Sequence, residues 1–234
     1  MHPLIGALIA YAVGSIPAAY LAGKAAGVDL RTHGSGNLGA TNVVRVLGVK
    51  VGLAVFAVDM IKGALPVALL PGVTTSHISP AWLAIVYGGA AIVGHVRPVW
   101  LRFGKGGKGV ATACGVFLAL TPIPTLFALA VFTTALIASG YVSLASLAAA
   151  GALPVLVAAA FGTHGPMLAV SVVIAAFVFW THRPNMARLR KGEEHHFSRL
   201  GSLSVAMGIA LAALVAVGGA ACLLWLGAGP RGLR

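Results

Sequence analysis

Residues 49–70 read VKVGLAVFAVDMIKGALPVALL, an apolar stretch of the length that a helix needs to cross a lipid bilayer. Two charged residues, Asp59 and Lys62, lie three positions apart in it and can pair on one helix face. Charges inside a span are costly and often functional. An ion pair that only packs helices, with Lys62 reaching toward the membrane surface, is the simpler interpretation, and both remain open.

Similar apolar runs recur along the chain of 234 residues, which is 59% hydrophobic and only 9% charged. A soluble domain carries about 25% charged residues. Sixteen basic residues face four acidic ones, but nucleic-acid-binding proteins spread such charge over a polar surface that is nearly missing here. The composition therefore predicts a membrane protein and argues against nucleic acid as a partner. The expected spans are 3–22, 49–70, 80–97, 122–139, 141–161, 165–182 and 203–227, with a shorter run at 109–120.

The sequence also allows predictions about the first apolar run and the two cysteines. No basic segment or convincing cleavage site precedes the first apolar run, so we expect 3–22 to be a span and not a removed signal peptide. Cys114 and Cys222 both lie in apolar runs. Core packing is their expected role, in preference to a disulfide or a metal site.

Basic residues sort the loops by side. Thirteen of the sixteen Lys and Arg residues fall in three segments, 24–50, 97–108 and 183–199, whereas the loop 71–79 has none. The positive-inside rule places the three basic segments in the cytoplasm and 71–79 outside. Two loops on one side require an even number of crossings between them. Either the short run 109–120 crosses as a tilted helix or one of the other runs does not cross, and we favour the first. The prediction is an all-α polytopic bundle of seven core transmembrane helices with the N-terminus outside, plus an eighth helix at 203–227.

The first basic segment contains the stretch 33-HGSGNLGATNVVR-45. Its glycines let the backbone present N–H groups to an anion, and its hydroxyls, amides and arginine add charge-assisted hydrogen bonds. A flexible interhelical turn is the alternative, but such turns rarely combine so many polar residue types. The candidate anion-binding residues are Gly34, Ser35, Gly36, Asn37, Thr41 and Arg45.

The second segment contains 103-FGKGGKG-109, which immediately precedes an apolar run. N–H groups at the start of a helix form a ready anion site. The spacing of a P-loop is absent, and a dinucleotide-binding fold would require a preceding strand. A membrane-surface anchor is the alternative. The candidate phosphate-binding residues are Gly104, Lys105, Gly106, Gly107, Lys108 and Gly109.

The third segment, 182-HRPNMARLRKGEE-194, places His182 and Asn185 three residues apart, so both can face one site if the helix continues past 182. A solvated basic segment that touches anionic lipid headgroups is the alternative. Three such loops on one membrane face predict one composite site for phosphate groups. The chain has no histidine followed four residues later by aspartate, the spacing of the His–Asp acyltransferase dyad. It also has no G-x-S-x-G motif and no cluster of carboxylates that could bind a metal. Catalysis is therefore expected to depend on positioning and charge stabilisation.

Together these stretches resemble the bacterial acyl-phosphate-dependent glycerol-3-phosphate acyltransferase family, PlsY. The stretches that carry the resemblance span residues 1 to about 200 and are 14-GSIPAAYLAGK-24, 34-GSGNLGATNVVR-45, 59-DMIKG-63, 94-GHVRPVWLRFGKGGKGVAT-112, 141-YVSLASL-147 and 182-HRPNMARLRKGEE-194. Gly104 in FGKGGKG, Pro184 in the third motif and the run 203–227 depart from the family pattern. The resemblance implies an acyltransferase core at 1–201, followed by an additional helix and tail at 202–234.

The resemblance also implies an enzyme of the bacterial inner membrane with its site on the cytoplasmic face, without a cofactor or metal. It would transfer a fatty acyl group from acyl phosphate to the 1-hydroxyl of glycerol 3-phosphate, giving lysophosphatidic acid and phosphate. Matching motifs assign catalytic roles to Ser35, Arg45, Lys105, His182 and Asn185. They assign binding to the remaining loop residues above and to Ser143, and a structural role to Glu193.

Three questions stay open from the sequence. His182 can be a base or a phosphate ligand, and a substrate phosphate can itself take the proton. Ser35 can orient the substrate or form an acyl-enzyme. A transporter of a phosphorylated metabolite is the alternative function, because broken helices with glycine-rich loops also suit anion transport. Against transport, the polar groups cluster in loops on one face, and the two halves show no internal repeat. A lipid-binding scaffold is a third possibility.

Overall fold

Residues 1–197 are described by a computed structural model, and in this range the chain forms helices and no strands. Prolines stand in the first turn of many helices, where the missing N–H costs nothing and the fixed φ favours the helix. The chain divides into two compact units, and their boundary in the sequence lies between Leu120 and Thr121. The predicted span 203–227 lies outside the described residues.

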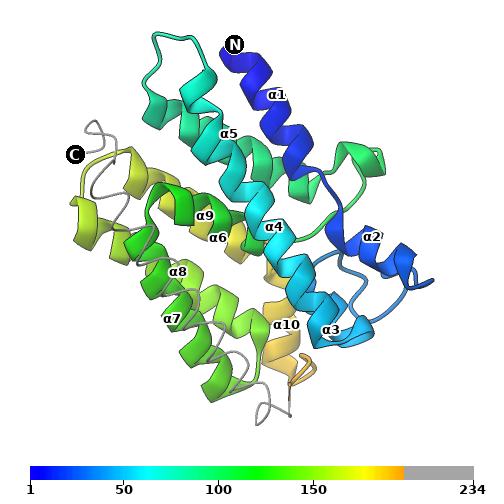
Figure 1. Ribbon diagram of the computed structural model, residues 1–234. Helices are drawn as coiled ribbons and strands as arrows, with labels where there is room; N and C mark the ends of the chain where they lie inside the picture. Colours follow the sequence, from blue (N-terminus) through cyan, green and yellow to red (C-terminus); the bar gives the residue numbers. More distant parts are fainter. Residues whose placement is uncertain (198–234) are drawn as a thin grey trace. The chain divides into compact units, whose positions relative to one another are not determined.

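The first unit, Met1–Leu120, contains helices α1 to α6. Their bounds are α1 Pro3–Gly14, α2 Ala18–Ala25, α3 Ala40–Leu47, α4 Val49–Leu69, α5 Pro80–Val96 and α6 Val110–Leu120, with 3₁₀ turns at Pro71–Val73 and Val99–Leu101. Helix α4 packs against α6, α3 and α5, and α1 packs along α5 (Figure 1).

Small residues allow these helices to approach closely, as is usual inside membranes. A Cβ at Gly63 of α4 would collide with the Thr112 backbone of α6, and a Cβ at Gly115 of α6 would collide with the Met60 backbone of α4. The two glycines therefore fix the separation of α4 and α6. Large apolar side chains such as Leu4 are exposed on the outer faces of the helices, which indicates a lipid-facing surface.

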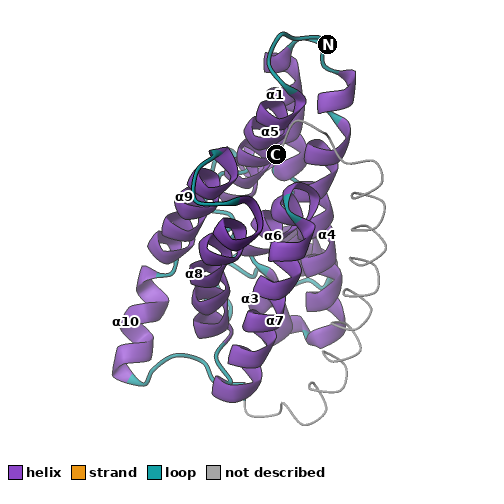
Figure 2. Ribbon diagram, turned by 90° about the vertical axis from the view of Figure 1, so that its left-hand side faces the viewer, coloured by secondary structure: helices purple, strands orange, loops and turns teal. Residues whose placement is uncertain are grey.

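The second unit begins at Thr121, and its described part contains α7 Pro122–Ser139, α8 Val142–Phe161, α9 Pro166–Thr181 and α10 Arg183–Lys191. Helix α8 packs against both α7 and α9. Figure 2, coloured by secondary structure, shows the short connections between these helices. Helices α9 and α10 meet at an angle of 54°.

The observed helices follow the predicted spans closely. Five segments of the described chain are long and apolar enough to cross a membrane, and the bent pair α9–α10 makes a sixth. The first span includes α1 and α2, which are separated by a break at residues 15–17. Helix α6 is apolar but has only 11 residues. The all-helical membrane architecture is thus present, with five or six long spans.

The N-terminus and the loop 71–79 lie at the same end of the first unit (Figure 1). The Met1 ammonium group donates to the Val73 carbonyl at 2.7 Å, and the Thr75 N–H donates to the Met1 carbonyl at 2.9 Å. Two segments that the sequence analysis placed on the same side of the membrane are therefore neighbours in the fold.

Candidate functional site

The first glycine-rich loop is shaped by one buried amide, Asn42 in the first turn of α3. Its Oδ1 accepts a hydrogen bond from the Ser35 N–H at 2.7 Å, and its Nδ2 donates to the carbonyls of Leu30 and His33. Gly34 has a φ of 62°, and a Cβ there would collide with Asn42 Oδ1. The amide and the glycine therefore fit each other, and the backbone around Ser35 is held in one shape.

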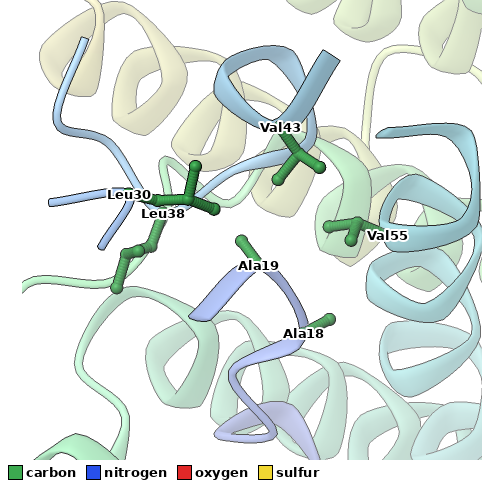
Figure 3. Close-up of a cluster of buried hydrophobic side chains, with 6 residues drawn as sticks. All are labelled: Ala18, Ala19, Leu30, Leu38, Val43 and Val55. Atoms are coloured by element: carbon green, nitrogen blue, oxygen red, sulfur yellow. The ribbon is translucent and has the colours of Figure 1, made fainter. Parts of the chain in front are cut away.

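A hydrophobic cluster contains residues from both ends of this loop (Figure 3). Leu30 and Leu38 flank the loop and are buried together with side chains of α2, α3 and α4, which are Ala18, Ala19, Val43 and Val55. Burial of this apolar surface stabilises the loop's ends, so the polar residues between them lie at the surface of the unit.

The candidate residues of the first stretch are divided between a loop and a helix. Ser35 is exposed and Asn37 is half-buried in the loop, whereas Thr41 and Arg45 belong to α3. The latter two are one helical turn apart, so they share a face. The sequence analysis treated residues 40–45 as loop because they contain no apolar run; the structure shows that they form an amphipathic helix.

The nearby Arg31 is paired within its own turn. Its guanidinium forms a 2.8 Å ion pair with Asp29 and lies over the Tyr20 ring at 5.5 Å from the centroid. The side-chain hydrogen bonds from Arg31 are the main reason that the pKa of Asp29 is lowered to about 2. Arg31 and Asp29 thus largely neutralise one another beside the loop.

The second glycine-rich loop, 104–109, ends at the first turn of α6. Gly109 has a φ of 84°, and its carbonyl accepts from the Ala113 N–H at 2.8 Å. The first N–H groups of α6, which have no partner within the helix, therefore border the loop. Such a position suits an anion. Lys105 is exposed and Lys108 is half-buried.

The two glycine-rich loops lie against each other. A Cβ at Gly107 would be 2.9 Å from the carbonyl oxygen of Leu38, a residue at the end of the first loop. Leu38, Gly106 and Gly107 also line one small pocket. The structure thus brings together two segments that are about seventy residues apart in the sequence.

In the second unit, His182 lies at the bend between α9 and α10 and is buried. Its Nδ1 lies 2.8 Å from the Val178 carbonyl oxygen. Because a carbonyl only accepts, Nδ1 carries the proton, and the lone pair of the neutral ring is on Nε2. Pro184 is the second residue of α10, where a proline is tolerated, so it marks the start of a helix and does not disrupt one.

Asn185 is held by a carboxylate from the end of the third motif. Its Nδ2 donates to Glu194 Oε1 at 2.7 Å, and Arg188 Nε donates to Glu194 Oε2 at 2.7 Å. Burial raises the pKa of Glu194, but the hydrogen bonds from Asn185 and Arg188 lower it by more than burial raises it. The net effect is a lowered pKa, so Glu194 is a carboxylate at neutral pH.

Glu194, and not its neighbour, is the acidic residue that contacts a predicted site residue. Glu193 is exposed, and its backbone N–H donates to the Arg188 carbonyl at 2.8 Å. The sequence predicts a structural role for Glu193 and assigns no separate role to Glu194 or Asn42. The adjacent acidic pair pointed to the right place, but only the fold shows which carboxylate turns inward.

The segment after α10 folds back on the turn between α7 and α8. The Phe197 N–H donates to the Gly140 carbonyl at 3.0 Å, and the His196 ring packs edge-on against Tyr141. This places the third motif beside Ser143, which is buried in the first turn of α8. No group of three or more His, Cys, Asp or Glu side chains that could hold a metal ion occurs among residues 1–197.

The sequence profile of the family described as "Glycerol-3-phosphate acyltransferase" matches residues 4–192. A glycerol-3-phosphate acyltransferase of Geotalea daltonii is 50% identical over 190 residues, which are 81% of this chain and 95% of that protein. One from Geobacillus kaustophilus is 46% identical over 184 residues, 78% of this chain and 89% of the other.

Two solved structures have the same fold. Both are crystal structures of PlsY, an integral membrane glycerol 3-phosphate acyltransferase, one in a glycerol 3-phosphate form and one in a lysophosphatidic acid form. The first is 39% identical, with a TM-score of 0.78 over 86% of this chain and 98% of that chain. The second is 38% identical, with a TM-score of 0.75 over 85% and 96%.

Proposed function

This chain belongs to the glycerol-3-phosphate acyltransferase family and is a membrane acyltransferase; we propose that its acyl donor is acyl phosphate. In the proposed reaction the 1-hydroxyl oxygen of glycerol 3-phosphate attacks the acyl carbonyl carbon. A new ester C–O bond forms and the bond to the phosphate oxygen breaks. The products are lysophosphatidic acid and inorganic phosphate, and no cofactor takes part.

The single observation that supports an acyl phosphate donor best is the contact between the two glycine-rich loops. Gly107 packs against the Leu38 carbonyl, and each loop leads directly into a helix, α3 or α6. Each substrate of the proposed reaction carries one phosphate group, and two adjacent loops rich in backbone N–H groups suit two phosphates. A thioester donor would bring no phosphate to the reacting carbonyl.

We assign the binding of phosphate in the first unit to three cations and the loop backbone. Arg45 offers a planar fork for bidentate contacts, and Lys105 and Lys108 act as point charges. Ser35, Asn37 and Thr41 orient the substrates by hydrogen bonds. The N–H groups that complete the site belong to Gly34, Gly107 and Gly109. Those of Gly36, Gly104 and Gly106 donate to backbone carbonyls instead, so these three glycines shape the loops.

In the second unit we assign the base to His182. The hydrogen bond from its Nδ1 to Val178 leaves Nε2 as the proton acceptor of the neutral ring. Nε2 takes the hydroxyl proton as the acyl group is transferred, and the departing phosphate or solvent then receives that proton. Asn185 and Ser143 orient the substrate, and Glu194 holds Asn185 in place.

We propose seven crossings with the N-terminus outside and the site on the cytoplasmic face of the bacterial inner membrane. Helix α6 supplies the seventh crossing, in addition to the five long spans and the bent pair. The contact of Met1 with the loop 71–79 supports this arrangement, because both segments are expected outside. The acyltransferase core is residues 1–201.

The donor can be tested with protein purified in detergent or in lipid. Labelled glycerol 3-phosphate is supplied with either palmitoyl phosphate or palmitoyl-coenzyme A, and lysophosphatidic acid is measured. We expect product from palmitoyl phosphate only. Product formed from the coenzyme A thioester at a comparable rate would contradict acyl phosphate as the donor. The family assignment would not be affected.

Direct transfer can be separated from a covalent route through Ser35. A single turnover with acyl-labelled palmitoyl phosphate is quenched early, and the protein is checked for bound label. Direct attack predicts none in the wild type. A burst of labelled protein that disappears in Ser35→Ala would establish an acyl-enzyme instead.

A further inference from the structure

Asp59, Lys62 and His95 form a buried ionic cluster inside the first unit. Asp59 is 1% exposed, Lys62 is 4% and His95 is 5%. Lys62 Nζ lies 2.7 Å from Asp59 Oδ1, and His95 Nδ1 lies 3.5 Å from the same oxygen. Moving charged groups out of water costs free energy. The attraction between them offsets this cost only where the partners are held in good geometry.

Lys62 connects the cluster to the break in the first span. Its ammonium group donates to the Ile16 carbonyl at 2.7 Å, beside Pro17. Pro17 interrupts the helix between α1 and α2, so the Ile16 carbonyl is available to a side chain and not committed to a regular helical turn. Lys62 is buried within the unit and joins α4 to this break.

His95 connects the cluster to the second glycine-rich loop. It lies in the last turn of α5, and a Cβ at Gly107 would collide with its Nε2. A Cβ at Gly106 would collide with the His95 carbonyl, and the Gly106 N–H donates to the Val96 carbonyl at 3.0 Å. Asp59, Lys62 and His95 line the same small pocket as Gly106 and Gly107.

We propose that Asp59, Lys62 and His95 are positioning residues that hold the loop 104–109 in its phosphate-binding shape. The carboxylate fixes the imidazole from one side, and the imidazole supports Gly107 from the other. This role rests on the proposed function of that loop. Backbone N–H groups bind phosphate well only when they are held in place before the ligand arrives. The buried Asp59–Lys62 ion pair and the His95 ring packed beside it provide that rigidity.

The test uses substitutions that remove the support without leaving a lone buried charge. One is His95→Ala, and the other is the double variant Asp59→Asn/Lys62→Met, which keeps His95. Asp59→Asn alone is avoided because it leaves the Lys62 charge uncompensated. Tyr87→Phe is the matched control. Tyr87 lies on the same helix as His95 and is buried, but its hydroxyl forms a hydrogen bond with Thr74 in the loop 71–79.

Binding of glycerol 3-phosphate and of inorganic phosphate is measured by calorimetry on purified protein, with thermal unfolding in parallel. We expect the Kd of at least one probe to rise about tenfold or more in both variants and to stay unchanged in Tyr87→Phe. His95→Gln, which restores an amide near the Nε2 position, should recover part of the loss relative to His95→Ala. If His95 contributes only to stability, His95→Gln should bind the probes no more tightly than His95→Ala.

Two results would overturn the positioning role. One is folded variants whose Kd for both probes stays within about threefold of the wild type. The other is loss of folding in both variants while Tyr87→Phe folds, which would indicate a general role in stability. These measurements need no acyl donor, so failure to use palmitoyl phosphate would count only against the proposed donor. Absence of binding by the wild type would count against the phosphate loop itself.

Discussion

Asn42 determines the shape of the first loop more than any residue that the sequence analysis selected there. Its amide makes three hydrogen bonds to the backbone of residues 30–35. Asn42→Ala should lower the free energy of unfolding by about 1–3 kcal/mol, because buried backbone groups lose their partners. Chemical denaturation in detergent measures this. Thr32→Ala, which removes an exposed hydrogen bond in the same loop, is the control and should change it by less than about 0.5 kcal/mol.

A substitution at His182 can distinguish a role in proton transfer from a role in substrate binding. In His182→Asn the side-chain amide can still donate to the Val178 carbonyl, but the acceptor at Nε2 is lost. We expect kcat to fall by about 10²–10⁴-fold with little change in stability. Steady-state kinetics in lipid measure both constants. A rise in KM at constant kcat would contradict the base and identify His182 as a phosphate ligand.

The sequence indicates candidate site residues but not the partners that support them. Ser35 and His182 stand out because polar types are rare in so apolar a chain. Asn42 and Glu194 act through contacts that depend on how the loop and the helix end fold back, and adjacent identical residues such as Glu193 and Glu194 cannot be distinguished by composition. Asp59 and Lys62 were recognised as a pair, but their partner His95 is more than thirty residues away.

The hydrogen bonds of Glu194 make the end of α10 sensitive to acid. Its pKa is lowered in the fold, so its stabilising contribution is complete above its ordinary value of about 4.3 and is lost as the pH falls through the lower folded value. Thermal unfolding of the wild type and of Glu194→Gln should therefore differ at pH 7 and converge as the pH falls through the lowered pKa of the folded state.

Glu193→Gln is the matched control for this comparison, because the Glu193 side chain is exposed. It should follow the wild type at every pH. A difference between Glu194→Gln and the wild type that persists unchanged in acid would show that the charge of Glu194 is not what stabilises this segment.

The long helices were predictable because their apolar runs end at prolines or polar residues. The run 49–70 became α4, Val49–Leu69, and 122–139 became α7, Pro122–Ser139. The short helices α3 and α10 are predicted as loops from the sequence, because neither contains an apolar run long enough to cross a membrane. The break at Pro17 was also missed, because residues 3–22 are apolar on both sides of it.

The proposed orientation of the whole chain can be tested by cysteine accessibility. In a background with Cys114 and Cys222 replaced by serine, Ser76→Cys lies in the loop 71–79 and Lys24→Cys lies at the end of α2, beside the first loop. A membrane-impermeant maleimide should label Ser76→Cys in intact cells and Lys24→Cys only after permeabilisation. The reverse pattern would place the site outside and contradict the positive-inside assignment.

The central claim is that this membrane acyltransferase transfers the acyl group of acyl phosphate directly to glycerol 3-phosphate. Its most direct test is the release of inorganic phosphate from palmitoyl phosphate by the purified protein in lipid, with lysophosphatidic acid measured in the same samples. The account predicts no phosphate release without glycerol 3-phosphate, and equal amounts of the two products with it. Rapid phosphate release that is independent of glycerol 3-phosphate, or lysophosphatidic acid formed without matching phosphate, would contradict it.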